Sequence, residues 1–160
     1  MSLVRFLMLL SLVVWVGGII FFAFVMAPTL FLPGMLPARQ FAGNVVSHTL
    51  AILHWVGLAS AVVFLACSMI DARAVEGVAH PFAARNVLVY LMIILTLVSM
   101  YGVGAKMLAL RKDMVFIDQV SQDDARRIEF HRLHQWSTRL ESTVLLLGMG
   151  VIYFTARRLN

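Results

Sequence analysis

The sequence predicts an all-α protein, a four-helix transmembrane bundle in which an amphipathic helix leads into the last span. Two observations carry this prediction. Four apolar stretches, each 15 to 22 residues without Asp, Glu, Lys or Arg, cover residues 6–27, 49–70, 87–105 and 142–156. Hydrophobic residues make up 61% of the 160 residues and charged residues 13%, against roughly 25% charged residues in soluble domains. A soluble domain of this length has too little interior for so much apolar surface, so lipid must cover it.

The length of the apolar stretches sets the expected spans. About 20 residues at about 1.5 Å each cross a hydrocarbon core of about 30 Å. Inside that core only helices and closed barrels satisfy their own backbone hydrogen bonds. We therefore expect helices at residues 6–27, 49–70, 87–107 and 138–156, forming one integral membrane domain over residues 1–160.

The first span is expected to end at Pro28, because proline lacks the N–H of a helix interior and disfavours helix in the residue before it. Its 22 uncharged residues exceed the roughly 7–15 apolar residues of a signal peptide, so we interpret it as a retained span. Pro33, Gly34 and Pro37 predict an irregular connection. The chain can return to helix over residues 38–48 and lead into the second span.

The two later connections differ in character. Residues 71–85 mix charges with Gly77 and Pro81, which is typical of a solvated turn. Residues 121–124, Ser-Gln-Asp-Asp, resemble a helix start, since hydroxyl and carboxylate oxygens cap free N–H groups. That helix is expected to pass through His134 into the last span, partly on the membrane surface.

The charge pattern indicates a membrane partner. The net charge is +5, and the 13 Lys and Arg residues lie mostly at helix ends and in connections, where anionic headgroups account for them. We therefore expect the lipid bilayer as partner and no nucleic acid. The expected location is a cell membrane crossed several times, namely a bacterial inner membrane. Eight of the 13 basic residues lie on the side of the first and third connections, which favours that side as the inner one.

Small residues in all four spans predict close contacts between helices. These positions are Gly17, Gly18, Gly57, Gly102, Gly104, Gly148 and Gly150. The same faces leave open a homo-oligomer or a membrane-protein partner. The lone cysteine, Cys67, is expected to be inert packing.

Ionisable groups at membrane depth are costly and usually functional. His54 in the second span, and His134, Arg139 and Glu141 at the entry of the last, are the candidates. One hypothesis places His54 opposite His134, where two imidazoles can ligate a haem iron or a metal ion, or relay protons. The alternative is that each histidine bonds a neighbouring hydroxyl or carbonyl and only ties helices together.

Helical spacing sorts the residues of the last span. His131, His134, Thr138 and Glu141 recur at three and four residues and share one face. His134 and Glu141 are about 10.5 Å apart along the axis, too far for a hydrogen bond. Ser137 and Glu141, four residues apart, can meet.

Two stretches of the chain resemble a known family. The first contains Trp15, Gly17, Gly18, Phe24, Pro28, Phe31, Pro37, Arg39, Phe41, Gly43 and His54, and the second contains Phe130, His131, Arg132, His134, Trp136 and Ser137. Together they resemble the transmembrane protein 205-like family of four-span membrane proteins, whose bacterial relatives are described only as a domain of unknown function. The resemblance implies a site beside the first and third connections, formed by Arg39, His54, Arg132, His134 and Ser137. Where that family has an asparagine early in the last span, this chain has Glu141.

We therefore expect a membrane protein that binds or helps to transport a small solute or metal at a polar pocket. The expected pocket residues are Arg39, His54, Arg132, His134, Ser137 and Glu141. The first alternative is a b-type haem protein acting in redox chemistry, with His54 and His134 as ligands of haem b or a metal ion. It is suggested by a fainter resemblance to copper-resistance membrane subunits and to haem-binding protoporphyrinogen oxidases. The second alternative is an accessory subunit of a larger complex. No motif of soluble-type catalysis occurs, which leans against an enzyme.

Overall fold

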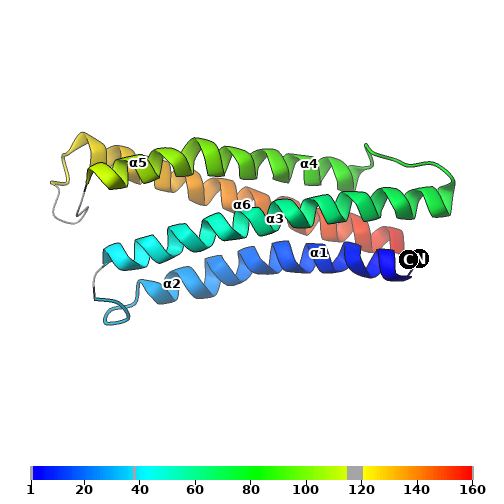
Figure 1. The fold of residues 1–160 in the computed structure, drawn as a ribbon, viewed down its shortest axis with the longest axis horizontal. Helices are drawn as coiled ribbons and strands as arrows, with labels where there is room; N and C mark the ends of the chain where they lie inside the picture. Colours follow the sequence, from blue (N-terminus) through cyan, green and yellow to red (C-terminus); the bar gives the residue numbers. More distant parts are fainter. Residues whose placement is uncertain (1, 38, 115–120, 160) are drawn as a thin grey trace.

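The structure is a computed structural model that describes residues 2–37, 39–114 and 121–159. Four long helices lie side by side along the molecule (Figure 1). In chain order the elements are α1 (Ser2–Phe21), η1 (Phe22–Met26), α2 (Ala27–Leu30), α3 (Arg39–Glu76), α4 (Ala84–Leu97), η2 (Val98–Gly104), α5 (Ala105–Asp113) and α6 (Ala125–Leu159). The two η elements are π-helices that continue α1 and α4 without a break. The four-helix bundle predicted from the sequence is confirmed.

All four helices are long and apolar enough to cross a membrane. The continuous helices Ser2–Leu30 and Ala84–Asp113 have 29 and 30 residues, whereas α3 and α6 have 38 and 35. At about 1.5 Å per residue, α3 and α6 reach about 53–57 Å, well beyond a hydrocarbon core of about 30 Å. Their ends therefore extend past the lipid tails.

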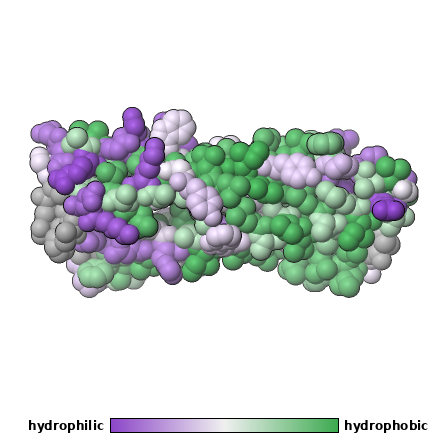
Figure 2. Space-filling view, turned by 45° about the horizontal axis from the view of Figure 1, so that its top comes forward, coloured by the Kyte–Doolittle hydropathy of each residue, from purple (hydrophilic) through white to green (hydrophobic). Residues whose placement is uncertain are grey.

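The two ends of the bundle differ. The chain termini and the α3–α4 connection lie at one end, named here the terminal end (Figure 1). The opposite end, named the loop end, holds α2, the start of α3, the end of α5 and the start of α6. Hydrophilic residues gather at the loop end, and apolar residues cover the middle of the face shown in Figure 2. The part of the bundle that extends beyond the lipid tails thus lies mainly at the loop end.

Pro28 does not end the first helix, contrary to the prediction. The helix continues through α2 to Leu30. The π-helix η1 directly precedes it, and the N–H of Ala27 donates to the carbonyl of Phe22, five residues back. The wider π turn removes the clash that a proline ring makes with the carbonyl four residues before it. Pro28 can therefore stay within the helix although it has no N–H to donate.

The expectation of a solvated turn over residues 71–85 is wrong at both ends of that segment. α3 runs on to Glu76 and stops at Gly77, whose φ of +76° suits glycine at a helix C-terminus. Asp71 and Arg85 are 1% and 3% exposed. Both belong to the bundle interior, because α3 and α4 each extend beyond the apolar stretch within them.

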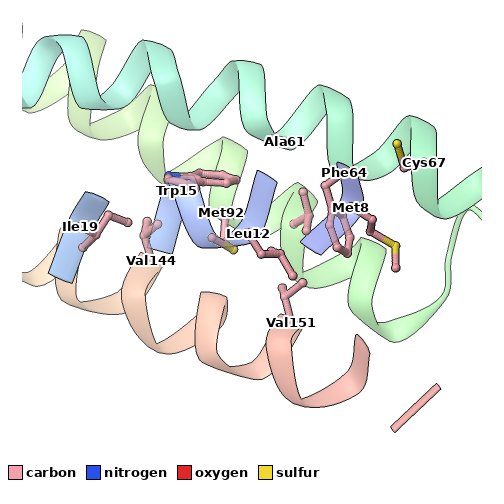
Figure 3. Close-up of a cluster of buried hydrophobic side chains, with 11 residues drawn as sticks. Met8, Leu12, Trp15, Ile19, Ala61, Phe64, Cys67, Met92, Val144 and Val151 are labelled. Carbon is pink, nitrogen blue, oxygen red and sulfur yellow. The ribbon is translucent and has the colours of Figure 1, made fainter. Parts of the chain in front are cut away.

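The apolar core lies between all four helices (Figure 3). It contains Met8, Leu12, Trp15 and Ile19 of α1, Ala61, Phe64 and Cys67 of α3, Val89 and Met92 of α4, and Val144 and Val151 of α6. α1 packs chiefly on α3, and α4 chiefly on α6. Large apolar side chains such as Phe21, Val62 and Leu146 are 60–72% exposed, as expected for helices that face lipid.

Glycine allows three of the close approaches. A Cβ at Gly57 would overlap the indole of Trp15, and a Cβ at Gly18 or Gly148 would lie 2.7 Å from a side-chain carbon of Leu53 or Val16. The predicted packing role of these glycines is confirmed.

Candidate functional site

A buried polar triad joins three helices at the middle of the bundle. Nε2 of His54 on α3 lies 2.6 Å from Oε1 of Glu141 on α6. The hydroxyl of Ser99 in η2 donates to the same carboxylate oxygen at 3.2 Å. His54 and Ser99 are buried, and the side chain of Glu141 is 15% exposed. We name His54, Ser99 and Glu141 the central triad.

The central triad lies at membrane depth. His54 and Ser99 fall inside the second and third apolar stretches, and Glu141 directly precedes the fourth. An ionised side chain at that depth is costly unless it is paired and hydrogen-bonded. The carboxylate of Glu141 meets both conditions, since an imidazole and a hydroxyl contact it. The short distance to His54 is typical of a charge-assisted hydrogen bond.

The backbone around Ser99 is unusual. η2 is a seven-residue π-helix, and such segments are rare and often lie at functional sites. Gly104 closes it, where a Cβ would come within 3.1 Å of the carbonyl oxygen of Ser99. Glycine at this position therefore lets the wide turn form, and the turn presents Ser99 to Glu141.

His54 and His134 do not meet. His54 is engaged by Glu141, whereas His134 is exposed on α6. Since His134 precedes Glu141 by seven residues, it lies about 10.5 Å along the helix from the group that His54 contacts. The histidine pair of the sequence hypothesis is not formed.

The other expected pocket residues lie nearer the loop end. Arg132 is exposed and forms an ion pair with Glu129 at 2.8 Å. Ser137 is half-buried, and Glu141 contacts Ser99 and His54 rather than Ser137. Arg39 begins α3, but its side chain lies outside the described part of the structure. Of the five expected residues whose side chains the structure describes, it thus brings together two, His54 and Glu141.

A second polar cluster lies at the terminal end. Asp71 of α3 is paired with Arg5 of α1 at 2.9 Å and lies 3.8 Å from the guanidinium of Arg158 on α6. Arg158 also forms an ion pair with Glu76 at 2.5 Å. Because Asp71 is fully buried, its two arginines are the groups that compensate its charge. These contacts link α1, α3 and α6.

Arg85 extends this cluster to α4. Its Nε and Nη2 donate to the hydroxyl and carbonyl of Ser68 at 2.9 and 3.3 Å. The Ser68 hydroxyl donates to Asn86 at 2.7 Å, and Asn86 donates to the carbonyl of His80 at 3.0 Å. We name Arg5, Ser68, Asp71, Glu76, Arg85, Asn86 and Arg158 the terminal cluster. It draws residues from all four helices, and its buried members, Ser68, Asp71, Arg85 and Asn86, belong to α3 and α4.

A third contact fixes the loop end. Nη1 of Arg111 on α5 donates to the Gly43 carbonyl and the Ser47 hydroxyl of α3, both at 2.9 Å. Its guanidinium lies 5.5 Å from the ring centre of Phe130 on α6. Arg111 therefore ties three helices together where the bundle leaves the membrane.

Comparison with known protein families shows to which family the chain belongs. The family described as a domain of unknown function (DUF4149) matches residues 10–115, about two thirds of the sequence. The chain belongs to this family. The matched region includes His54 and Ser99 of the central triad and ends before Glu141. No curated protein and no solved structure matches the chain.

Sequence reasoning missed Ser99, Asp71 and Arg85. For Asp71 a signal was present: Ala61, Phe64, Ser68 and Asp71 recur at three and four residues, so they share one face of α3. Ser99 is one of few polar residues in the third apolar stretch. No sequence pattern around Ser99 predicts that its hydroxyl contacts Glu141, which lies on another helix.

The histidines do not fit a haem held between two helices. Nε2 of His54, a nitrogen that would bind iron, contacts Glu141 instead, and His134 is exposed elsewhere. Among the described residues no group of three His, Cys, Asp or Glu side chains could hold a metal ion. The central triad offers one imidazole, one carboxylate and one hydroxyl, which is a proton-exchanging set.

Proposed function

We propose that this protein binds a small cationic solute inside the membrane and helps it across, and that the proton is the solute that suits the site best. The observation that carries the proposal is the 2.6 Å contact between His54 and Glu141 at membrane depth. The proposal keeps the expected transport role and places it at the central triad.

The chemistry of the pair supports a proton. With one proton shared between imidazole and carboxylate the pair is neutral, and adding or removing a proton leaves one net charge. Uncompensated charge is costly at this depth, so a change of protonation favours a rearrangement of the helices that hold the pair. The Ser99 hydroxyl can donate and accept, which extends the path for a proton.

A metal cation is the weaker candidate. Metal ions take four or more ligands, and the triad supplies three side-chain groups, one of them a neutral hydroxyl. A proton needs only the two groups that already touch.

The test uses purified protein in lipid vesicles that contain a pH-sensitive dye. A potassium diffusion potential drives protons inward. We expect acidification with the natural protein and its loss in His54→Gln and Glu141→Gln. His48→Gln and Glu129→Gln are matched controls, since both change a less buried side chain of the same type on the same helix, and both should retain the flux.

Proton binding is measured separately from transport. Infrared difference spectra between two pH values should show a carboxylate signal that disappears in Glu141→Gln and shifts in Ser99→Ala. If both the flux and this signal are the same in Glu141→Gln as in the natural protein, the proposal is wrong. A signal without flux would limit the function to binding.

We also propose a more specific family relation, a membrane location and a surface for a partner. The stretches at residues 15–54 and 130–137 support a relation to the transmembrane protein 205-like family, and the four helices able to span a membrane suit a place in a bacterial inner membrane. Gly17 lies on the outer side of α1 with no atom within 4 Å of an added Cβ, which would suit a second copy or a membrane partner. A Gly17→Leu variant that loses a cross-linked dimer or a co-purifying partner would support this surface.

A further inference from the structure

Three buried polar atoms in this region have no hydrogen-bond partner among the described residues: Nη1 of Arg85, the hydroxyl of Thr155 and Nη2 of Arg158. The last lies in the ion pair with Glu76, so Nη1 of Arg85 and the hydroxyl of Thr155 are the two orphans. Arg85 is 3% exposed and Thr155 is 0% exposed. Buried polar atoms in native proteins are almost always paired, and an orphan commonly marks a bound water or ion.

The two groups face the same region. Thr155 precedes Arg158 by three residues, so the two share one face of α6. Along the facing helices α4 and α6, a Cβ at Gly148 would meet Met92 and one at Gly150 would meet Leu88. The same antiparallel register brings Thr155 opposite Arg85 further toward the terminal end. α4 and α6 also pack closely along their lengths. Both orphans therefore border the terminal cluster.

The charges of this region do not balance. Arg5, Arg85 and Arg158 bring three positive charges, and Asp71 and Glu76 bring two negative ones. One positive charge is left over, and the arginine that is buried, Arg85 at 3% exposed, forms no ion pair among the described residues. Protonation of His80, which contacts Glu76 at 2.7 Å, would add to the surplus. Buried surplus charge is costly unless a counter-ion compensates it.

We propose that a monovalent anion of halide size binds between Arg85 and Thr155. Such an ion accepts hydrogen bonds from both orphans and neutralises the surplus charge. A water molecule could accept the same two bonds but would leave the charge. A lipid phosphate is too large to reach two donors that are fully buried. The nearby carboxylates repel an anion less than their number suggests, since Asp71 and Glu76 are each paired with arginine.

The region also has a route from water. An open hollow reaches the cluster at the terminal end, and it is lined by Glu76, His80, Pro81, Phe82, Ala83 and Arg158. The side chain of Arg158 is 23% exposed, so it connects the hollow with the buried groups. An ion can enter here without crossing lipid.

The experiment is thermal unfolding of the full chain in mild detergent, with chloride or bromide replaced by gluconate at constant pH and ionic strength. We expect chloride and bromide to raise Tm by about 3 °C or more, with saturation, because a ligand that binds only the folded state stabilises it. Thr155→Val keeps the side-chain shape and removes the hydroxyl. It should lose most of this halide-dependent rise.

Thr138→Val is the matched control, because Thr138 is exposed on the same helix; it should respond to chloride like the natural protein. Equal Tm in chloride and gluconate would mean that water fills the space and would overturn the proposal. An unchanged chloride response in Thr155→Val would overturn it too, since the ion would then act elsewhere. Glu141→Gln should keep the halide response, so this site stands or falls independently of proton binding.

Discussion

The central triad and the terminal cluster both bury ionisable side chains in one bundle, but they differ in kind. The triad holds one histidine and one hydroxyl that both contact the same carboxylate. The terminal cluster holds three arginines and two carboxylates drawn from all four helices. The first contains an imidazole and a carboxyl group that can take up or release a proton, whereas arginine keeps its charge at any physiological pH.

The difference follows depth in the membrane. Asp71 and Arg85 lie directly outside the second and third apolar stretches, while His54 and Ser99 lie inside them. The cost of a charge is greatest at the bilayer centre and falls toward its edge. Permanent charges can therefore serve as structural ties at the terminal end. At the depth of the central triad a net charge costs more. A His54–Glu141 pair that shares one proton has no net charge and therefore suits this depth.

The largest expected effect separates the two regions by stability. Asp71→Asn should destabilise the bundle by about 2–4 kcal/mol, because it takes a buried carboxylate away from Arg5 and Arg158, which are 38% and 23% exposed and keep part of their contact with water. Unfolding in mixed micelles with increasing SDS measures this. Asp123→Asn, in an exposed connection, is the control and should unfold like the natural protein. A loss as small as that of the control would show that the terminal cluster is not a structural tie.

The next largest loss of stability is expected where α1 packs closely against α3, between the two regions. Gly57→Ala should cost about 1–3 kcal/mol, because the added methyl group would overlap Trp15 and push α1 away from α3. Gly17→Ala has open space at its Cβ and should be neutral or slightly stabilising. Tryptophan fluorescence and SDS unfolding distinguish the two variants. Equal behaviour would contradict the close contact of α1 with α3.

The central triad should respond more mildly. His54→Gln and Glu141→Gln should each cost about 1–2 kcal/mol, since glutamine retains hydrogen-bonding groups but cannot form the charge-assisted pair. His134→Gln should stay within about 0.5 kcal/mol, because His134 is exposed. The comparison uses the same SDS unfolding. If His134→Gln were as harmful as His54→Gln, the pairing of His54 with Glu141 would be the wrong contact.

An exposed ion pair provides the smallest effect and a reference for both buried regions. Asp124 caps α6, accepting from the backbone N–H of Arg126 at 2.8 Å, and the side-chain hydrogen bond from Arg126 lowers the pKa of Asp124 to about 2. Because the folded pKa lies below the ordinary value of 3.8, the contribution is complete above that value and is lost as the pH falls toward 2. Amide NMR of the first turn of α6 should show local fraying in this range.

Asp124→Asn removes this acid transition while it keeps a capping side chain. Asp123→Asn should leave the transition in place. Fraying that is identical at pH 5 and pH 2 in the natural protein would contradict the role of Asp124 as a titrating cap.

Local rules were sufficient where a residue acts on its own segment. The capping of α6 by Asp124 agrees with the helix start predicted at residues 121–124. The rule that proline ends a helix failed at Pro28, because the preceding π-helix η1 accommodates the proline ring. Local rules also failed at Asp71, where the charge suggested solvent and the helical face led into the core.

The sequence by itself determined that the chain is a bundle of four membrane helices, because hydropathy accumulates over contiguous residues and lipid contact needs no knowledge of the partner helix. It also singled out His54 and Glu141 as costly groups. Only the tertiary structure decided that these two side chains meet, with Ser99 from a third helix. That contact depends on the rotation and register of α3, η2 and α6, which are set by packing such as that of Gly148 against Val16 and Met92. Periodicity within one helix contains no information about the rotation of another.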